Sequence, residues 1–116
     1  MKDYELEAAK RALKYAEDGV KKYEDKYKNL CKSFGSMIMS NGLAQAISFC
    51  EAKKDQHYEL LVENVKKEMN IFLEYKTKTE GSLSKNLLDM NIKDYMNFQR
   101  QLMITLKWLR RYVDIF

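Results

Sequence analysis

Basic residues near the end of the chain are its strongest candidates for binding chemistry. Three of the four arginines lie between residues 100 and 111, and Lys107 lies among them. Arginine can hold a phosphate group through two parallel hydrogen bonds, which lysine cannot do. We therefore predict that Lys107, Arg110 and Arg111 form a face that contacts phosphate.

Further basic residues occur in the first half of the chain. Lys53 and Lys54 come shortly after a long stretch without charge, and Lys21 and Lys22 lie in a lysine-rich segment. A solvated surface, or compensation of a helix dipole, is the alternative interpretation of each lysine. Another N-terminal cluster consists of Lys10, Arg11 and Lys14. The predicted nucleic-acid-binding residues are Lys21, Lys22, Lys53, Lys54, Lys107, Arg110 and Arg111.

Groups that could do catalysis are scarce. The single histidine, His57, is expected to be solvated or capping at the start of a helix. No serine, cysteine or threonine lies in a nucleophile-elbow setting, and no glycine-rich phosphate loop occurs. Adjacent carboxylates such as Glu17 and Asp18 point apart on a helix, which makes them poor metal ligands. We expect no enzyme, no metal site and no cofactor.

The two cysteines, Cys31 and Cys50, lie on apolar helical faces and not in a metal-binding pair. We therefore expect buried free thiols, which fit a reducing compartment. The N-terminal segment MKDYELEAAK has no apolar targeting core, and we find no lipidation motif or membrane-spanning segment. The sequence predicts a cytoplasmic protein.

Composition favours helices throughout. The 116 residues are 46% hydrophobic and include no proline and only four glycines. A net charge of +4 is compatible with binding a polyanion but does not require it. We predict an all-α fold, a single domain over residues 1–116 that forms a compact bundle of five to six helices.

The centre of the predicted fold is the stretch from Ser33 to Cys50, which carries no charged residue although 33% of the protein is charged. It contains too many polar residues to span a membrane, so we expect two short buried helices broken at Asn41-Gly42. Gly42 suits a left-handed helix end, and Ser40 or Asn41 could cap the next helix. The expected buried faces consist of Phe34, Met37, Ile38, Leu43, Ala46, Ile47 and Cys50.

The remaining segments also read as helices. Apolar residues from Ala9 to Phe34 recur at steps of three and four, which predicts one long helix with a bend or close contact at Gly19 and a possible joint at 28–32. A coiled coil would give the same pattern, but the small and aromatic residues favour packing in a bundle. A helix capped by Asp55, a loop over 77–84 and a short helix follow.

The last predicted helix runs from Ile92 nearly to the end, with Asn91 and Asp94 as a capping box. We expect Trp108 to anchor this helix in the core, although an exposed Trp could stack on a base. The predicted apolar face consists of Ile92, Tyr95, Met96, Leu102, Met103, Leu106, Leu109 and Val113.

The order of these motifs is similar to a known family. An apolar helix with Met-Ile comes first, followed by Asn-Gly-Leu and then by a small-residue helix that ends in Phe and precedes Lys. This order resembles the small helical subunit of type III-B (Cmr) CRISPR effector complexes. The segment 106–112 (LKWLRRY) resembles the terminal helix of the same family. The other matching positions are Ile38, Asn41, Gly42, Leu43, Phe49 and Lys53.

This resemblance implies a non-catalytic subunit of an RNA-guided antiviral complex. It implies that copies stack head to tail into a filament beside the subunits that hold the guide RNA. Their basic faces would contact the backbone of the guide and target RNA duplex, while other Cmr subunits cleave RNA. The implied partners are therefore other subunits, further copies of the chain, and the guide and target RNA, without a membrane.

Two other functions stay open from the residues alone. One is a helical module that binds a protein through its long first helix, without nucleic acid. The other is a helix-turn-helix DNA-binding protein with Asn41-Gly42 as the turn. The segment after that turn, LAQAISFC, is apolar and has no basic residue, which argues against its entry into a DNA groove.

Overall fold

The computed structural model of the chain describes residues 3–74 and 81–116. Those residues form six α-helices and no strand, which confirms the all-α prediction. The Cα radius of gyration is 13.3 Å, close to the value of about 13 Å expected for a compact fold of this size. The helices are α1 (Asp3–Tyr23), α2 (Asp25–Asn41), α3 (Leu43–Ala52), α4 (Gln56–Leu73), α5 (Leu83–Leu88) and α6 (Ile92–Tyr112).

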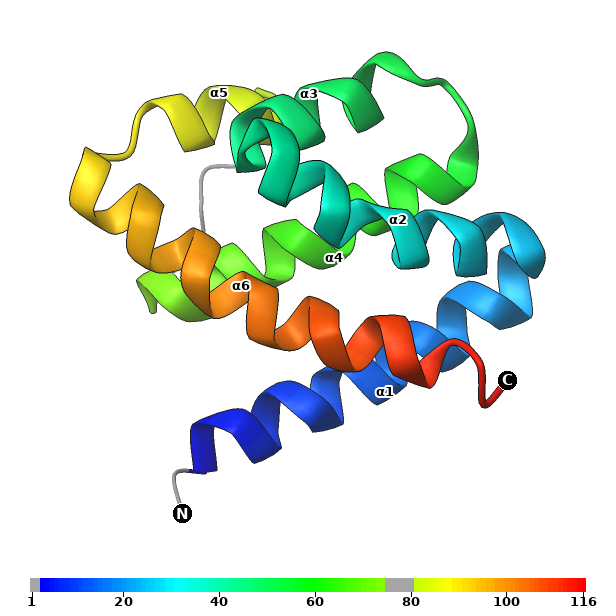
Figure 1. The fold of residues 1–116 in the computed structure, drawn as a ribbon. Coiled ribbons are helices and arrows are strands. Elements are labelled where there is room, and N and C mark those ends of the chain that lie inside the picture. Colours follow the sequence, from blue (N-terminus) through cyan, green and yellow to red (C-terminus); the bar gives the residue numbers. More distant parts are fainter. Residues whose placement is uncertain (1–2, 75–80) are drawn as a thin grey trace.

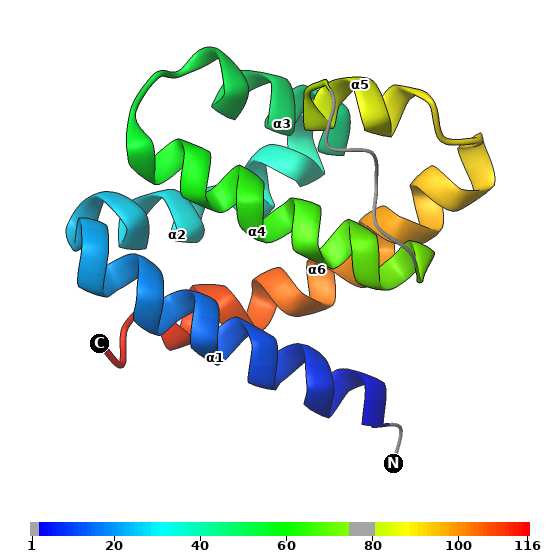
Figure 2. The same ribbon diagram turned by 180° about the vertical axis from the view of Figure 1, so that it is seen from behind.

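The helices surround one hydrophobic core. α1 packs along α6 on one side of the molecule, α2 and α4 lie in the middle, and α3 pairs with α5 on the opposite side (Figures 1 and 2). None of the helices in residues 3–74 and 81–116 is long and apolar enough to cross a membrane. The largest fully buried side chains include Tyr27, Phe34, Ile38, Leu43, Leu61 and Phe98.

The N-terminal segment folds as two helices, so the prediction of one long helix is wrong. The chain turns at Glu24, whose φ is +52°, and the predicted joint at 28–32 lies inside α2. The expected close contact at Gly19 is confirmed, because a β-carbon there would lie within 3.0 Å of the Tyr27 ring. The apolar spacing continues across the turn because Val20 and Tyr27 both face the core.

The predicted break at Asn41-Gly42 is confirmed, but its geometry differs from the expectation. Gly42 has a φ of +86° and a ψ of 160°, an extended conformation with positive φ that is not left-handed helical. Its N–H donates to the Ile38 carbonyl at 2.7 Å and so closes α2. Glycine fits here because residues that carry a side chain rarely adopt a positive φ of this kind.

The first N–H groups of α3 are capped by α6, so the expected cap from Ser40 or Asn41 is wrong. The Leu43 N–H donates to Oε1 of Gln99 at 3.0 Å. The Ala44 N–H donates to the hydroxyl of Tyr95 at 2.8 Å. These bonds satisfy donors that a helix start leaves without partners, and they fix α3 against α6.

α4 begins after Asp55, as the sequence predicts, whereas α5 begins inside the predicted loop. Asp55 is at the N-cap position of α4, but its side chain makes no capping hydrogen bond. Ser82 caps α5 by accepting from the Lys85 N–H at 3.2 Å. Of the loop predicted over 77–84, residues 77–80 lie outside the described residues, and Leu83 and Ser84 belong to α5.

α6 begins at Ile92 as predicted, and Asn91 caps it by accepting from the Asp94 N–H at 2.8 Å. Its first two turns are more exposed than expected: Ile92 is 74% exposed and Met96 46%. The buried face starts instead at Phe98, because this part of α6 turns Tyr95 and Gln99 towards α3. The buried residues of α6 are Phe98, Leu102, Thr105, Leu106 and Leu109.

Three side chains singled out by the sequence are buried. Cys31 and Cys50 are free thiols in the core, as predicted, and burial raises the pKa of each to about 12. His57 is only 9% exposed, and its ring centroid lies 4.4 Å from that of Tyr58. The expectation of a solvated histidine is therefore wrong, because α4 turns His57 inwards in its first turn.

Candidate nucleic-acid interface

The predicted phosphate-contacting residues of α6 lie in its last turns. Lys107, Arg110 and Arg111 are all exposed. The buried residues Leu109 and Val113 hold this end of the helix on the core. Exposed cations on a fixed helix end can meet a phosphate backbone without rearrangement of the fold. We call these three residues the α6 patch.

Trp108 supports this end of α6. Its ring stacks on that of Tyr112, with centroids 5.5 Å apart and an angle of 29° between the planes. Both rings are half-buried and pack against the core. Trp108 is therefore an anchor of the helix end, as expected, and its contact with Tyr112 leaves less of the ring open to a base.

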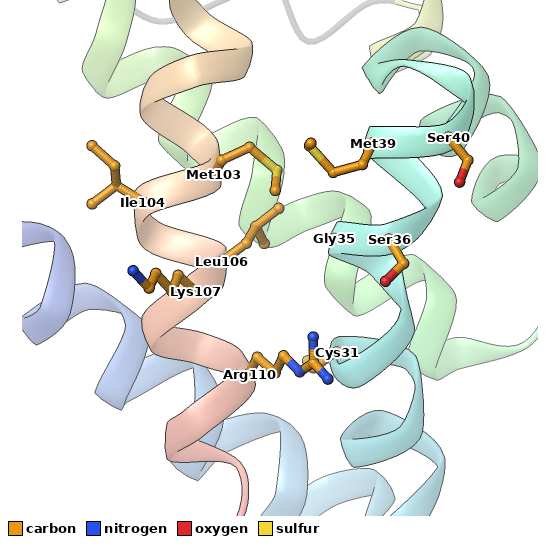
Figure 3. A pocket seen from close by; sticks show the side chains of 10 residues that line it. All are labelled: Cys31, Gly35, Ser36, Met39, Ser40, Met103, Ile104, Leu106, Lys107 and Arg110. Carbon is orange, nitrogen blue, oxygen red and sulfur yellow. The ribbon is translucent and has the colours of Figure 1, made fainter.

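The side chains of the α6 patch point in two directions. Arg110 extends towards α2 beside Cys31, whereas Lys107 lies on the side of α6 away from α2 (Figure 3). Within the part of the chain that the structure describes, Lys107, Arg110 and Arg111 take part in no ion pair. Their charges are therefore not neutralised by neighbouring carboxylates, which is the condition for attracting a polyanion.

Lys21 and Lys22 lie at the end of α1, on the same end of the molecule as the α6 patch. Lys21 lines a shallow pocket together with Ile115 and Phe116, which follow α6. Lys22 pairs with Asp18 one helical turn earlier, at 3.3 Å. Both residues of that pair are exposed, so the pair is worth about 0.5 kcal/mol or less and leaves Lys22 accessible.

Lys53 and Lys54 form a separate patch on the connection between α3 and α4, which we call the α3–α4 patch. Both are exposed, and Nζ of Lys53 lies 4.9 Å from the centroid of the Phe49 ring. α2 lies between this connection and the end of α6 (Figure 1). The structure thus divides the predicted residues into two groups, with Lys21 and Lys22 on the side of the α6 patch.

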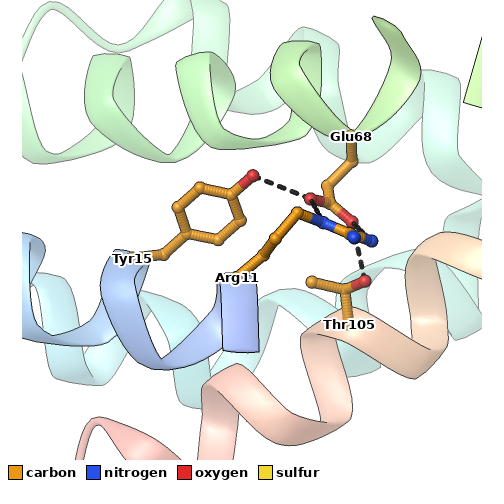
Figure 4. A network of polar contacts seen from close by, with 4 residues as sticks. All are labelled: Arg11, Tyr15, Glu68 and Thr105. Atoms are coloured by element: carbon orange, nitrogen blue, oxygen red, sulfur yellow. Dashed lines mark hydrogen bonds and ion pairs between the residues drawn. The ribbon is translucent and has the colours of Figure 1, made fainter. Parts of the chain in front are cut away.

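The cluster of Lys10, Arg11 and Lys14 is not a free basic surface, because Arg11 is tied into the bundle. Its Nε and one Nη donate to the Glu68 carboxylate at 2.7 and 3.1 Å. The hydroxyls of Tyr15 and Thr105 also donate to Glu68, each at 2.7 Å (Figure 4). The hydrogen bond to Glu68 raises the pKa of Arg11 further.

Glu68 stabilises the fold, and the sequence alone did not single it out. It is buried at the junction of α1, α4 and α6, where a charge is costly unless it is paired and hydrogen-bonded. The signal was present, because Leu61, Val65 and Glu68 follow a helical spacing that places all three on the buried face of α4.

Comparison with known proteins identifies the family. The family model described as CRISPR-associated protein (Cas_Cmr5) matches residues 4–116. The chain belongs to this Cmr5 family. The match extends over all six helices described above, from the second residue of α1 onwards, and includes both basic patches.

A solved structure has the fold of this Cmr5-family chain. The crystal structure of a CRISPR-associated Cmr5 family protein from Thermus thermophilus superposes with a TM-score of 0.79, at 16% sequence identity. The alignment covers 99% of this chain and 97% of the Thermus protein. At this identity the likeness shows the shared fold. No curated protein matches the chain.

The positions that carried the resemblance to Cmr subunits have two kinds of environment in this Cmr5-family chain. Ile38 and Leu43 are buried on either side of the Gly42 turn, and they define the α2–α3 corner. Phe49 and Lys53 are exposed and in contact with each other. The matching positions therefore include core residues of the α2–α3 corner and the first residue of the α3–α4 patch.

Proposed function

We propose that this chain is a non-catalytic small subunit of a type III-B CRISPR ribonucleoprotein effector, which acts in the cytoplasm in antiviral defence. The Cmr5 family match over residues 4–116 carries this proposal. Its partners would be the other Cmr subunits, further copies of the chain in a filament, and the backbone of the guide and target RNA.

The α6 patch is the first proposed contact with RNA. Arg110 and Arg111 are exposed and unpaired within the described residues, so each guanidinium can form two hydrogen bonds to one phosphate. Lys107, and Lys21 and Lys22 on α1, add positive charge around them. Such contacts give affinity and position without reading sequence, while base pairing with the guide supplies specificity.

The α3–α4 patch is the second proposed contact. Because α2 separates Lys53 and Lys54 from the α6 patch, one chain would meet the RNA backbone at two places. Each contact alone would be weak and sensitive to salt. Copies aligned in a filament would add such contacts along one duplex, which raises the overall affinity without any new type of contact.

Charge reversal in the assembled effector tests the proposal. The double variant Arg110→Glu, Arg111→Glu should weaken retention of target RNA, and each lost phosphate contact should reduce the salt dependence of binding by about one unit of slope. The matched control is Lys85→Glu, Lys93→Glu, which makes the same change of charge at exposed positions near the other end of α6.

The outcomes separate the parts of the proposal. Unchanged retention by the Arg110, Arg111 variant would show that the α6 patch does not contact RNA. Failure of the wild-type chain to purify with other Cmr subunits would contradict the subunit role itself. Recovery with one protein partner and no RNA would favour a helical protein-interaction module.

A further inference from the structure

A groove of about 550 Å³ lies between α2 and α6, on the surface next to the α6 patch. Its apolar wall includes Met39 of α2 and Met103 and Leu106 of α6. Figure 3 shows the two methionine side chains pointing towards each other across the opening. Met39 is 75% exposed, so a large apolar side chain at the mouth of the groove is left in water.

Small residues of α2 create this groove. Gly35, Ser36 and Ser40 line it from α2 and leave the space beside α6 unfilled. A β-carbon at Gly35 would touch only the Met103 methyl group, at an ordinary contact distance of 3.7 Å. The groove is therefore not closed by packing of the two helices, and its apolar wall is available to another molecule.

The charges at the groove have one sign. Arg110 crosses the end of the groove near Cys31, whereas Lys107 also lines the groove but directs its amino group to the side of α6 away from α2. None of the described residues that line the groove is acidic, and neither cation has an ion-pair partner within residues 3–74 and 81–116. An occupant with apolar side chains and at least one carboxylate would complement this surface.

The lining favours a protein segment over a nucleobase. No aromatic side chain is among the described lining residues, so the stacking that holds unpaired bases has no platform. Methionines have flexible side chains that adapt to apolar ones, and grooves between two helices accept the apolar face of a third helix.

We infer that the α2–α6 groove binds an amphipathic helix of a partner protein, with apolar residues against Met39, Met103 and Leu106 and an Asp or Glu on Arg110. This inference goes beyond the proposed RNA contacts. Because the Arg110 guanidinium has five N–H donors, it can donate to a carboxylate in the groove through one edge and still contribute to the proposed RNA face together with Arg111.

Site-specific crosslinking tests the occupant. Ser36 is exposed at the edge of the groove and would be replaced by p-benzoylphenylalanine in the full chain, expressed in its native host. The expected product is a crosslink to a protein segment with apolar residues at helical spacing and an excess of Asp and Glu. A crosslink to RNA, to a second copy of this chain or to a basic segment would overturn the inference, as would the absence of any crosslink.

A second variant shows whether the groove itself is responsible. Gly35→Leu fills the groove without changing charge and should lower the crosslink yield about tenfold, the effect of losing a central contact. Lys85→Glu, at an exposed position of α5 outside the groove, should leave the yield unchanged. If Gly35→Leu reduces the thermal stability of the chain, Met39→Glu replaces it, because Met39 is exposed and the new carboxylate would repel an acidic helix. An undiminished yield in the folded variant would overturn the inference.

Discussion

The ring of Tyr27 occupies the space that a side chain at Gly19 would need. A β-carbon at Gly19 would lie within 3.0 Å of three atoms of that ring. The ring cannot easily move, because its hydroxyl donates to Oδ1 of Asn64 at 2.6 Å and the residue is fully buried. This contact sets how closely α2 folds back on α1 after the turn at Glu24.

Gly19→Ala should therefore destabilise the protein, although alanine favours helices. Forcing a methyl group into a packed core costs about 1–3 kcal/mol. Gly35→Ala is the matched control, because its β-carbon meets only ordinary contact and the gain in helix propensity should stabilise by up to about 1 kcal/mol. Urea unfolding of both variants measures the difference. Equal stability of the two variants would contradict the packing argument.

Replacement of Glu68 should loosen the junction of α1, α4 and α6. Glu68→Gln removes the charge that pairs with Arg11 and replaces one of the two oxygens that accept from Tyr15 and Thr105 by an NH2 group, so we expect a loss of about 2–3 kcal/mol in the free energy of unfolding. The double variant Arg11→Met, Glu68→Met should recover much of that loss, because no charge is left without its partner. If the double variant is less stable than Glu68→Gln, the loss of stability in Glu68→Gln does not come from an unpaired charge on Arg11.

Stability should fall at alkaline pH because of the buried thiols. Burial raises the pKa of Cys31 and Cys50 from 9.0 to about 12, so in this range the unfolded chain binds fewer protons than the folded one. The stabilisation is complete below pH 9 and is lost as pH rises towards 12, at up to about 1.4 kcal/mol per pH unit for each thiol.

Denaturant unfolding between pH 8 and pH 11 measures this loss. The double variant Cys31→Ala, Cys50→Ala should have a flatter profile. Some slope should remain, because burial also raises the pKa of Tyr15 and Tyr27. An identical slope in the wild type and the double variant would exclude the thiols as the cause.

Loss of Glu51 should free α5 from α3. The Glu51 carboxylate accepts from the N–H groups of Leu83 and Ser84 at 2.9 and 3.3 Å, and from the Ser84 hydroxyl at 2.5 Å. In Glu51→Ala we expect faster amide hydrogen exchange in α5, by the equivalent of about 1 kcal/mol. Glu59→Ala, at an exposed position of α4, is the control and should leave α5 unchanged.

The two basic patches should act independently on RNA binding by the effector. Lys53→Glu, Lys54→Glu should weaken RNA retention on its own, and its effect should add to that of Arg110→Glu, Arg111→Glu, because α2 separates the two patches. Binding measured at several salt concentrations checks both the affinity and its slope. If the combined variant retains RNA as well as the more impaired of the two double variants, the patches do not bind separate stretches of backbone.

Much of this fold could be predicted from the sequence where local signals decide it. The Asn41-Gly42 break, the Asn91 cap and the buried cysteines follow from residue type and helical spacing. The turn at Glu24 could not be found in that way, because nothing in the local sequence marks it. It depends on the close approach of Gly19 and Tyr27, which belong to different helices.

Contacts between distant segments explain the other differences. α3 is capped by Tyr95 and Gln99, more than fifty residues further along the chain, and Arg11 finds its partner at Glu68. Charge clustering identified the exposed cations of the candidate interface, but not that α2 separates them into two patches. The groove beside Gly35 depends on which residues α6 places opposite α2, and spacing within one helix does not contain that information.

The packing of α1 against α6 has a consequence for synthesis on the ribosome. α1 leaves the exit tunnel before α6, the helix that it contacts most, so α1 stays without that partner until α6 has emerged. Its apolar residues are exposed in the meantime, and such nascent segments are prone to aggregate. We therefore expect the nascent chain to depend on chaperones until α6 is released, and to fold only after translation of that helix.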